Sequence, residues 1–451
     1  MNVKSDIKTR ENVFRSILAN VTKSSFVRNL LIVMSGTALA QILGYALSPI
    51  ISRLFSPSDF GVFGSFYAIV NIIAAGLTLD YGLAIVLPRE KNDAANLFAL
   101  SCLSTLIISA GCLIVTLLSP GLIKNLIKAP GSWVLVLFII AIFVSGINQT
   151  FQAWSVRVKA FKQTSASQVI RSLSTNGTQV GLGYLKGGAT ALILTSILGD
   201  ILASANLAAV VLRDFRMMRE SIHWGRMKQL AKEYRDFPIY SASMSVVNTL
   251  SLGLPIILLT RFYGIAVAGA YAFGSKIIQA PMGLIQRPLR QVLYQKACET
   301  HNEGGRLLTL YLKFTIGLFA VALLPSLVIM IWGPQLFMWI FGTQWHLAGV
   351  FTQSLILWFM FMFCNLPADL CTRIARMQRT MAIFDVALLA VRTAALYLGG
   401  KYLSAVHTVL LFSIVGAGMN AIYIVIIGFA LKKRESETTW RGILNAIKEG
   451  Q

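Results

Sequence analysis

The sequence predicts an all-α, polytopic membrane protein with twelve transmembrane helices, arranged as two parallel-related six-helix bundles around a central cavity. The composition, the lengths of the apolar runs and the placement of basic residues support this fold class. Of the 451 residues, 56% are apolar and 13% are charged, whereas soluble chains carry roughly 25% charged residues. The apolar runs are long enough for helices to cross a bilayer. They must be helical, because a spanning helix satisfies its own backbone polar groups.

Charged or Pro/Gly-rich breaks divide the apolar runs into two sets of six. The expected spans of the first set lie near residues 29–52, 61–87, 95–118, 132–152, 165–185 and 189–212. Those of the second set lie near residues 237–261, 265–286, 309–332, 346–367, 379–400 and 404–431. We therefore expect an N-terminal bundle over residues 29–212, a linker over 213–236 and a C-terminal bundle over 237–431.

The positions of Lys and Arg support this topology, because cytoplasmic loops are enriched in both residue types. With the N-terminus inside, the inner segments hold 31 of the 40 basic residues and the outer loops hold six. Both termini are then cytoplasmic: residues 1–28 form a segment expected to include an interfacial helix, and residues 432–451 form a tail. Topology and anionic inner-leaflet lipid explain the net charge of +22 without a nucleic-acid partner.

Motifs for chemistry on a soluble substrate are missing from the sequence. It contains no Walker A loop, HExxH zinc motif, GxSxG elbow or CxxC pair. Residues 269–276 have phosphate-loop spacing, but Ser275 and Lys276 stand in reversed order inside an apolar run. The five cysteines fall in or beside expected spans and are expected to pack in the core. We expect a protein that is not an enzyme and has no cofactor or metal site.

Polar side chains recur at helical spacing along four of the expected spans. They are Thr37, Gln41, Tyr45, Ser48 and Ser52; Gln168, Arg171, Thr175 and Thr178; Ser241, Ser245 and Asn248; and Lys276, Gln279, Gln286 and Arg290. The neutral members have a structural alternative, since such side chains often bond across helix interfaces. A charge within a span costs roughly 2.5 to 3.5 kcal/mol and usually faces water or a partner. Lys276 and Arg171 are therefore the stronger candidates for function.

Three acids within expected spans, Asp80, Asp200 and Asp385, are candidates for ion coupling. A transporter driven by protons or sodium needs at least one acid that can exchange its cation. For Asp385, a structural charge network with Arg392 seven residues further on is the alternative.

Several segments resemble one known family. SRLFSPSDFG at residues 52–61, AIVLP at 84–88, FP at 237–238 and GAYAFGSKI at 269–277, followed by Pro281, are similar to segments of the polysaccharide repeat-unit flippases of bacterial inner membranes. These flippases belong to the multidrug/oligosaccharidyl-lipid/polysaccharide exporter superfamily. The number of spans and the six-plus-six division agree over nearly the whole chain.

The resemblance implies a substrate: an undecaprenyl-diphosphate-linked oligosaccharide, moved from the cytoplasmic to the periplasmic leaflet by alternating access during O-antigen or exopolysaccharide biosynthesis. The family often has a cation at the position of Lys276, and a diphosphate requires a counter-charge in a low-dielectric cavity. The expected substrate-binding residues are Lys276, Gln279, Arg171, Gln41, Tyr45, Asn248 and Arg290. Membrane lipids, a polysaccharide polymerase, a chain-length regulator and a proton or sodium coupling ion are the other expected partners.

Two other function classes remain open. A cation-coupled multidrug exporter shares the architecture, but acids and aromatics are expected to dominate a cavity for cationic drugs. A polysaccharide polymerase or ligase is the enzyme alternative. Those enzymes typically carry one large periplasmic loop, whereas the longest expected loop here is cytoplasmic.

Overall fold

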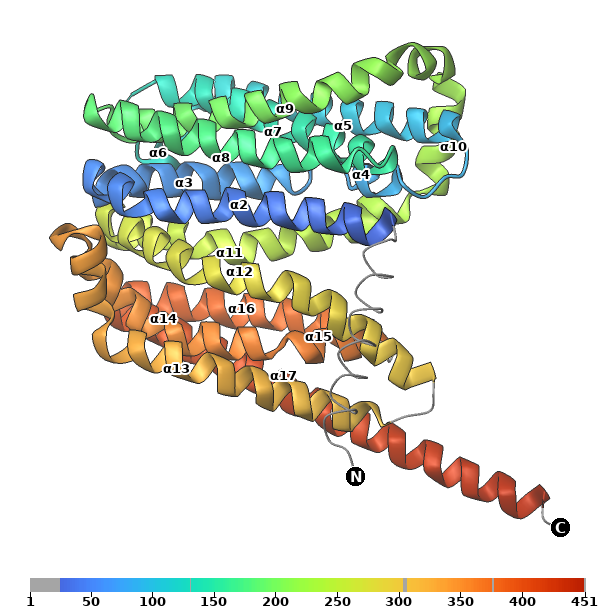
Figure 1. The fold of residues 1–451 in the computed structure, drawn as a ribbon. Coiled ribbons are helices and arrows are strands. Elements are labelled where there is room, and N and C mark those ends of the chain that lie inside the picture. The colour runs from blue at the N-terminus through green and yellow to red at the C-terminus, as the bar shows by residue number, and fades with distance from the viewer. Residues whose placement is uncertain (1–24, 130, 303–305, 375–376, 450–451) are drawn as a thin grey trace, which may run out of the picture.

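The computed structural model describes residues 25–129, 131–302, 306–374 and 377–449, and within these ranges it contains helices and no strand. The expected interfacial helix near the N-terminus falls mainly on residues 1–24, which lie outside the described residues. The two lobes lie one above the other in Figure 1, and α2 and α3 of the upper lobe face α11 and α12 of the lower lobe.

Six long helices form each lobe. The N-terminal lobe contains α2 (Ser25–Leu54), α3 (Pro57–Ala74), α5 (Lys91–Leu118), α7 (Trp133–Arg157), α8 (Phe161–Tyr184) and α9 (Gly188–Ser221). The C-terminal lobe contains α11 (Ala242–Tyr263), α12 (Ile265–Asn302), α13 (Leu307–Phe341), α14 (His346–Cys364) with α15 (Leu366–Ile374), α16 (Gln378–Tyr402) and α17 (Ala405–Glu449). The short helices are α4 (Tyr81–Ala84), α6 (Pro120–Ile127), α10 (Trp224–Glu233), the π-helix η1 (Phe237–Ser241) and the 3-10 helix η2 (Thr343–Trp345).

The expected count of twelve long helices is confirmed, and nine described segments are long and apolar enough to cross a membrane. The long helices outside that set of nine are α2, α8 and α12. Each of these three carries one of the polar stripes seen in the sequence. In α2, residues Ala38–Leu54 form a shorter apolar stretch. The protein is therefore a multi-pass membrane protein.

One expected span is wrong in its extent. The run at residues 61–87 is not a single helix, because α3 ends at Ala74 and α4 begins at Tyr81. Between them Leu79 and Asp80 adopt left-handed backbone angles, with φ of 48° and 54°. A helix cannot continue through such residues. At its other end α3 begins with a capping box, in which Ser56 and Asp59 satisfy each other's backbone N–H groups.

The two lobes repeat the same helix packing. In the N-terminal lobe α2 packs on α8, α8 on α9, α7 on α9 and α5 on α7; in the C-terminal lobe α11 packs on α16, α16 on α17, α14 on α17 and α13 on α14. The detail repeats too. A Cβ at Gly183 of α8 would contact Leu54 at the end of α2, and one at Gly400 of α16 would contact Phe262 at the end of α11. The predicted relationship between the two halves is thus visible in the packing.

The lobes meet where the parallel helices α3 and α12 cross. A Cβ at Gly61 would lie 2.0 Å from the carbonyl oxygen of Ile265, and one at Gly269 would lie 1.8 Å from the carbonyl oxygen of Pro57. Gly61 and Gly269 are 208 residues apart in the sequence, and their contact partners Pro57 and Ile265 are also 208 residues apart. Each helix therefore uses corresponding residues against the other, as in a self-complementary two-fold contact. Only glycine permits so close an approach of the two backbones.

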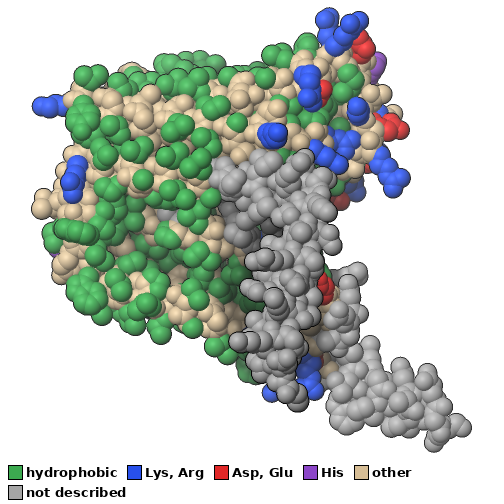
Figure 2. Space-filling view, in the orientation of Figure 1, with side chains coloured by type: hydrophobic (Ala, Val, Ile, Leu, Met, Phe, Trp, Pro, Cys, Tyr) green, Lys and Arg blue, Asp and Glu red, His purple; other side chains and the backbone are tan. Residues whose placement is uncertain are grey.

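Lys and Arg side chains gather at one end of the molecule, on the right of Figure 2. We call this the basic end; it includes Arg213, Arg216, Arg219, Arg226, Lys228 and Lys232 of α9 and α10. The end where α2 and α11 finish and α3 and α12 begin is the opposite end.

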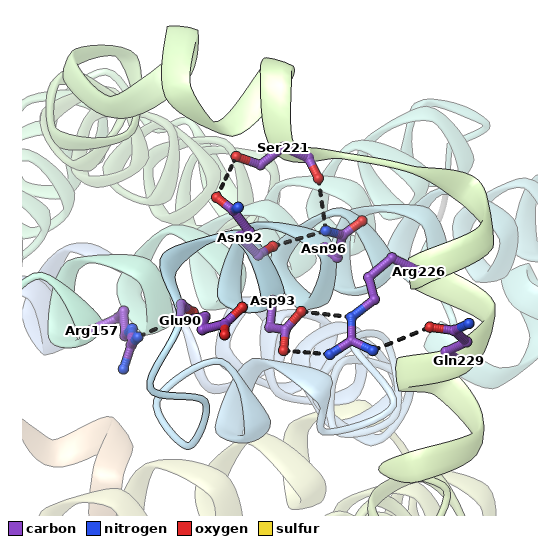
Figure 3. A network of polar contacts seen from close by, with 8 residues as sticks. All are labelled: Glu90, Asn92, Asp93, Asn96, Arg157, Ser221, Arg226 and Gln229. Carbon is purple, nitrogen blue, oxygen red and sulfur yellow. Dashed lines mark hydrogen bonds and ion pairs between the residues drawn. The ribbon is translucent and has the colours of Figure 1, made fainter.

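A polar network at the basic end ties α10 to the N-terminal lobe (Figure 3). Nε and Nη2 of Arg226 each donate to a different carboxylate oxygen of Asp93, both at 2.7 Å, and these bonds raise the pKa of Arg226. Ser221 Oγ donates to Asn92, and Asn96 donates to the carbonyl of Ser221. The linker helix α10 is thereby part of the N-terminal lobe, and the passage between lobes is the short segment of residues 234–236 before η1.

Gly269→Ala is expected to lower the yield and thermal midpoint of folded protein, because its methyl group would overlap the backbone of α3. Overpacking of this kind costs about 1–3 kcal/mol. Gly283→Ala is the matched control on the same helix, since nothing lies within 4 Å of its Cβ position. Size-exclusion chromatography after heating to a series of temperatures measures the thermal midpoint of each variant. Midpoints that are equal in Gly269→Ala and the wild type would contradict the close crossing.

Candidate functional site: a polar cavity between the lobes

Two polar cavities of about 500 Å³ and 540 Å³ lie between the lobes. The first is lined mainly by α2 and α8. The second is lined mainly by α12, with further residues from α2, α3, α11, α14 and α16. Gln41, Tyr45 and Lys276 line both cavities, so the two meet where α2 faces α12. The helices α2, α8 and α12 thus each place part of a polar stripe in the cavity wall. Water in the cavity can hydrate their polar faces, which lowers the cost of holding them in a membrane.

Five of the seven expected substrate-binding residues line this space. They are Gln41, Tyr45, Lys276, Gln279 and Arg171. The side chain of Lys276 is exposed to the cavity.

The other two expected binding residues, Asn248 and Arg290, are not among the lining residues. Asn248 lies on the same face of α11 as the lining residue Leu252, one turn closer to the start of the helix, and it is exposed. Arg290 lies near the basic end of α12 and forms an ion pair with Asp369 of α15. For both, the sequence spacing identifies the correct helix face but not the depth at which the cavity ends.

The three candidate coupling acids lie in different surroundings. Asp200 on α9 is 6% exposed and pairs with Arg171 of α8, with an Nε–Oδ1 distance of 2.6 Å. Asp80 lies in the turn before α4 and accepts hydrogen bonds from Ser241 at 2.6 Å and Ser245 at 3.3 Å. These bonds join the N-terminal lobe to the start of the C-terminal lobe. Among the three acids, Asp200 is the one joined to a side chain of the cavity wall.

Asp385 is half-buried on α16. The ion pairs among the described residues do not include one between Asp385 and Arg392. Arg392 instead lies between the rings of Trp358 and Phe412. The structural charge network considered as an alternative for Asp385 is therefore wrong for this partner.

Several lining residues were not singled out as binding candidates in the sequence. They include Asn71, Gln152, Asn176, Gln179, Trp358 and Arg392. Asn176 and Gln179 belong to a second polar row on α8, beside the row that contains Arg171. Thr178, which the spacing had placed in the first row, lies in an apolar groove with Gly177 and Gly181 on another face of α8. The polar residues on both sides of Arg171 in the sequence were the signal from which this wider polar surface of α8 could have been predicted.

Hydrogen bonds join the lobes at the opposite end. The carbonyl of Ser52 on α2 accepts from Gln344 at 2.6 Å and from the Trp345 indole at 2.8 Å, while Ser52 Oγ donates to the carbonyl of Phe341. The Trp345 ring also packs against Phe273, with centroids 4.1 Å apart. Together with the crossing of α3 and α12, these contacts close the cavity toward the opposite end.

Residues 50–349 match a family described as polysaccharide biosynthesis protein. The chain belongs to this family. No curated protein matches the sequence. The family assignment and the twelve-helix fold agree with the resemblance found in residues 52–61 and 269–277.

Solved structures of transporters share the fold. An inward-facing multidrug resistance MATE family transporter of the MOP superfamily superposes with a TM-score of 0.69 at 16% identity, covering 88% of this chain and 95% of its own. The lipid II flippase MurJ, in an inward closed conformation, superposes with a TM-score of 0.70 at 12% identity, covering 92% and 93%. The family member described here therefore has the architecture of MOP-superfamily transporters.

The pair of Arg171 and Asp200 is expected to be coupled energetically. Arg171→Gln should lower the thermal midpoint of the purified protein, because it leaves a buried carboxylate without a counter-charge. Adding Asp200→Asn should recover part of that loss, since the effects of substitutions at two residues in contact are not additive. Arg216→Gln is the control, because the Arg216–Glu220 pair is 95% and 69% exposed. Strictly additive losses in the double variant would contradict the pair.

Proposed function

We propose that this protein is a flippase that moves undecaprenyl-diphosphate-linked oligosaccharide repeat units from the cytoplasmic to the periplasmic leaflet. One observation carries this proposal. The charged side chains that line the two cavities, among the described residues, are Lys276, Arg171 and Arg392, all of them cations. Asp200 pairs with Arg171 but is not itself a lining residue. A cavity of this charge suits an anionic substrate.

Lys276 is the residue to which we assign the lipid diphosphate. It lines both cavities, and its ammonium group supplies a compact positive charge with three donors. Surrounding amides and hydroxyls, including Gln41, Tyr45, Gln279 and Asn176, offer donors and acceptors to sugar hydroxyl groups. The cavity therefore combines a positive charge for the diphosphate with neutral polar groups for the sugars.

The basic end is assigned to the cytoplasm of a bacterial inner membrane, with both termini on that side. The contacts at the opposite end, made by Ser52, Trp345 and the crossing of α3 and α12, then close the periplasmic side. Transport by alternating access requires the Ser52 contacts to break while the lobes pivot at the glycine crossing. A proton or sodium ion exchanging at Asp200 would change the charge partner of Arg171, which makes this pair the proposed place of ion coupling.

The cavity disfavours the two alternative functions. The cavity wall does contain aromatic side chains, including Tyr45 and Trp358, but its charged side chains are all positive, and positive charges repel a cationic drug. A polymerase or ligase requires a group of catalytic side chains, and the polar residues of the cavity are assigned to substrate binding instead. A polysaccharide polymerase and a chain-length regulator are proposed as the downstream partners that take the translocated repeat unit.

Depletion of the protein in cells is expected to trap lipid-linked oligosaccharide in the cytoplasmic leaflet. A membrane-impermeant periplasmic probe, with total lipid-linked sugar measured alongside, reports the leaflet. Re-expression should restore periplasmic labelling. Normal labelling with lost polymer would move the function to a later step, and drug sensitivity without a sugar phenotype would favour the exporter.

Lys276→Ala is expected to abolish restoration in the same assay, and Lys276→Arg to retain part of it, because Arg keeps the charge. Lys313→Ala is the matched control, since Lys313 on α13 is exposed outside the cavity. Immunoblotting shows whether the variants are equally abundant. Full restoration by Lys276→Ala at native abundance would contradict its assigned role.

A further inference from the structure

Arg392 on α16 is buried without an acidic partner. Its side chain is 4% exposed, and its guanidinium carbon lies 3.9 Å from the ring centroid of Trp358 and 4.1 Å from that of Phe412. The ion pairs recorded for the described residues do not involve Arg392. The two aromatic faces offset part of the cost of burying this charge, but they leave its N–H groups without acceptors.

Three hydrogen-bond donors around this guanidinium are unsatisfied. Nε and Nη2 of Arg392 and Nε1 of Trp358 are buried and have no hydrogen-bond partner within the described residues. Buried donors without acceptors cost free energy, and such groups are rare in native structures. All three are donors, so an oxygen-bearing group is the kind of partner they lack.

A second arginine of the same protein shows what this edge of a guanidinium binds. Arg226 uses its own Nε and Nη2 to hold both carboxylate oxygens of Asp93, each at 2.7 Å (Figure 3). The geometry of two parallel N–H groups matches a carboxylate or a phosphate. At Arg392 the same edge has no such partner.

The two residues that carry these donors border the substrate cavity. Arg392 and Trp358 line the cavity of about 540 Å³ together with Lys276 and Gln279 of α12. The indole of Trp358 is fixed by α17, where a Cβ at Gly416 would lie 2.8 Å from the ring. The backbone N–H of Trp358 also donates to Ser413 Oγ of the same helix. The donors are thus held in place by the packing of α14, α16 and α17.

We propose that Arg392 and Trp358 form an oxyanion-binding site in the C-terminal lobe, in addition to Lys276. The identity of the ligand rests on the proposed function: the site binds an oxyanion of the lipid-linked oligosaccharide. That oxyanion is either a phosphate of the lipid diphosphate or the carboxylate of an acidic sugar. Lys276 and Arg392 then hold the substrate from two different helices.

Binding of two soluble probes to the purified full-length protein tests this site. The probes are farnesyl diphosphate, which carries the diphosphate without a sugar, and glucuronic acid, which carries the carboxylate without a lipid. Arg392→Gln is expected to weaken binding of one of them about tenfold or more, because it removes a charge-assisted pair of hydrogen bonds. Arg392→Lys should restore part of that loss. Arg216→Gln, the same substitution at a 95% exposed residue, should change neither affinity.

Trp358→Phe is the second variant, chosen because it keeps an aromatic face for Arg392 and removes the indole N–H donor. It should weaken binding of the same probe by a smaller factor, about two- to tenfold. Thermal midpoints measured in parallel establish that each variant is folded.

The outcomes separate the two sources of the oxyanion. A loss confined to farnesyl diphosphate assigns the site to a lipid phosphate, and one confined to glucuronic acid assigns it to an acidic sugar. If wild-type protein binds neither probe, or folded Arg392→Gln and Trp358→Phe bind both as the wild type does, the proposed site is wrong.

The proposed function fails in a different way. Oxyanion binding at Arg392 in a protein whose depletion leaves lipid-linked oligosaccharide normally distributed would support the site and contradict the flippase. Trapped oligosaccharide on depletion, with unchanged probe binding by Arg392→Gln, would support the flippase and contradict the site.

Discussion

The crossing of α3 and α12 at Gly61 and Gly269 is the contact on which the two-lobed architecture depends. Each lobe packs its own helices, but a cavity between lobes requires that they touch in few places and still hold a fixed relation. Two glycines bring the backbones together near the opposite end, and the Ser52 contacts add hydrogen bonds there. Because α3 and α12 are parallel and use corresponding residues, neither lobe is privileged in a pivoting motion. The space between the lobes is left to polar side chains.

Polar side chains in membrane helices are costly, and this protein concentrates that cost on the surfaces that face one another. The helices α2, α8 and α12 carry three of the four polar stripes, and the same helices border the cavities. Lys276 lies where the cavities meet, Arg171 is paired with buried Asp200, and Arg392 lies between two rings. These three cations are stabilised in three different ways: by exposure to the cavity, by an acid and by aromatic faces. Their common sign favours an anionic substrate for the whole cavity.

The apolar runs of the sequence predicted the fold class and the number of long helices. Helical spacing predicted part of the cavity's polar face, because it determines which side chains share a face. It could not determine depth, which depends on where neighbouring helices diverge. Asn248 and Arg290 are therefore on correct faces but outside the lining. Arg392 was missed as a binding residue because its partners Trp358 and Phe412 come from other helices. The break at Leu79 and Asp80 lies within an apolar run, and hydropathy carries no signal for left-handed backbone angles.

Transbilayer movement of lipid-linked oligosaccharide in proteoliposomes that contain only this protein is the most direct measurement of the central claim. An impermeant probe added outside labels only the outer leaflet. With the wild-type protein the labelled fraction should rise toward completeness as lipid is exchanged between leaflets. With Lys276→Ala it should stay at the level of protein-free liposomes. A labelled fraction that the wild-type protein leaves unchanged, with a coupling-ion gradient imposed in either direction, would contradict the account.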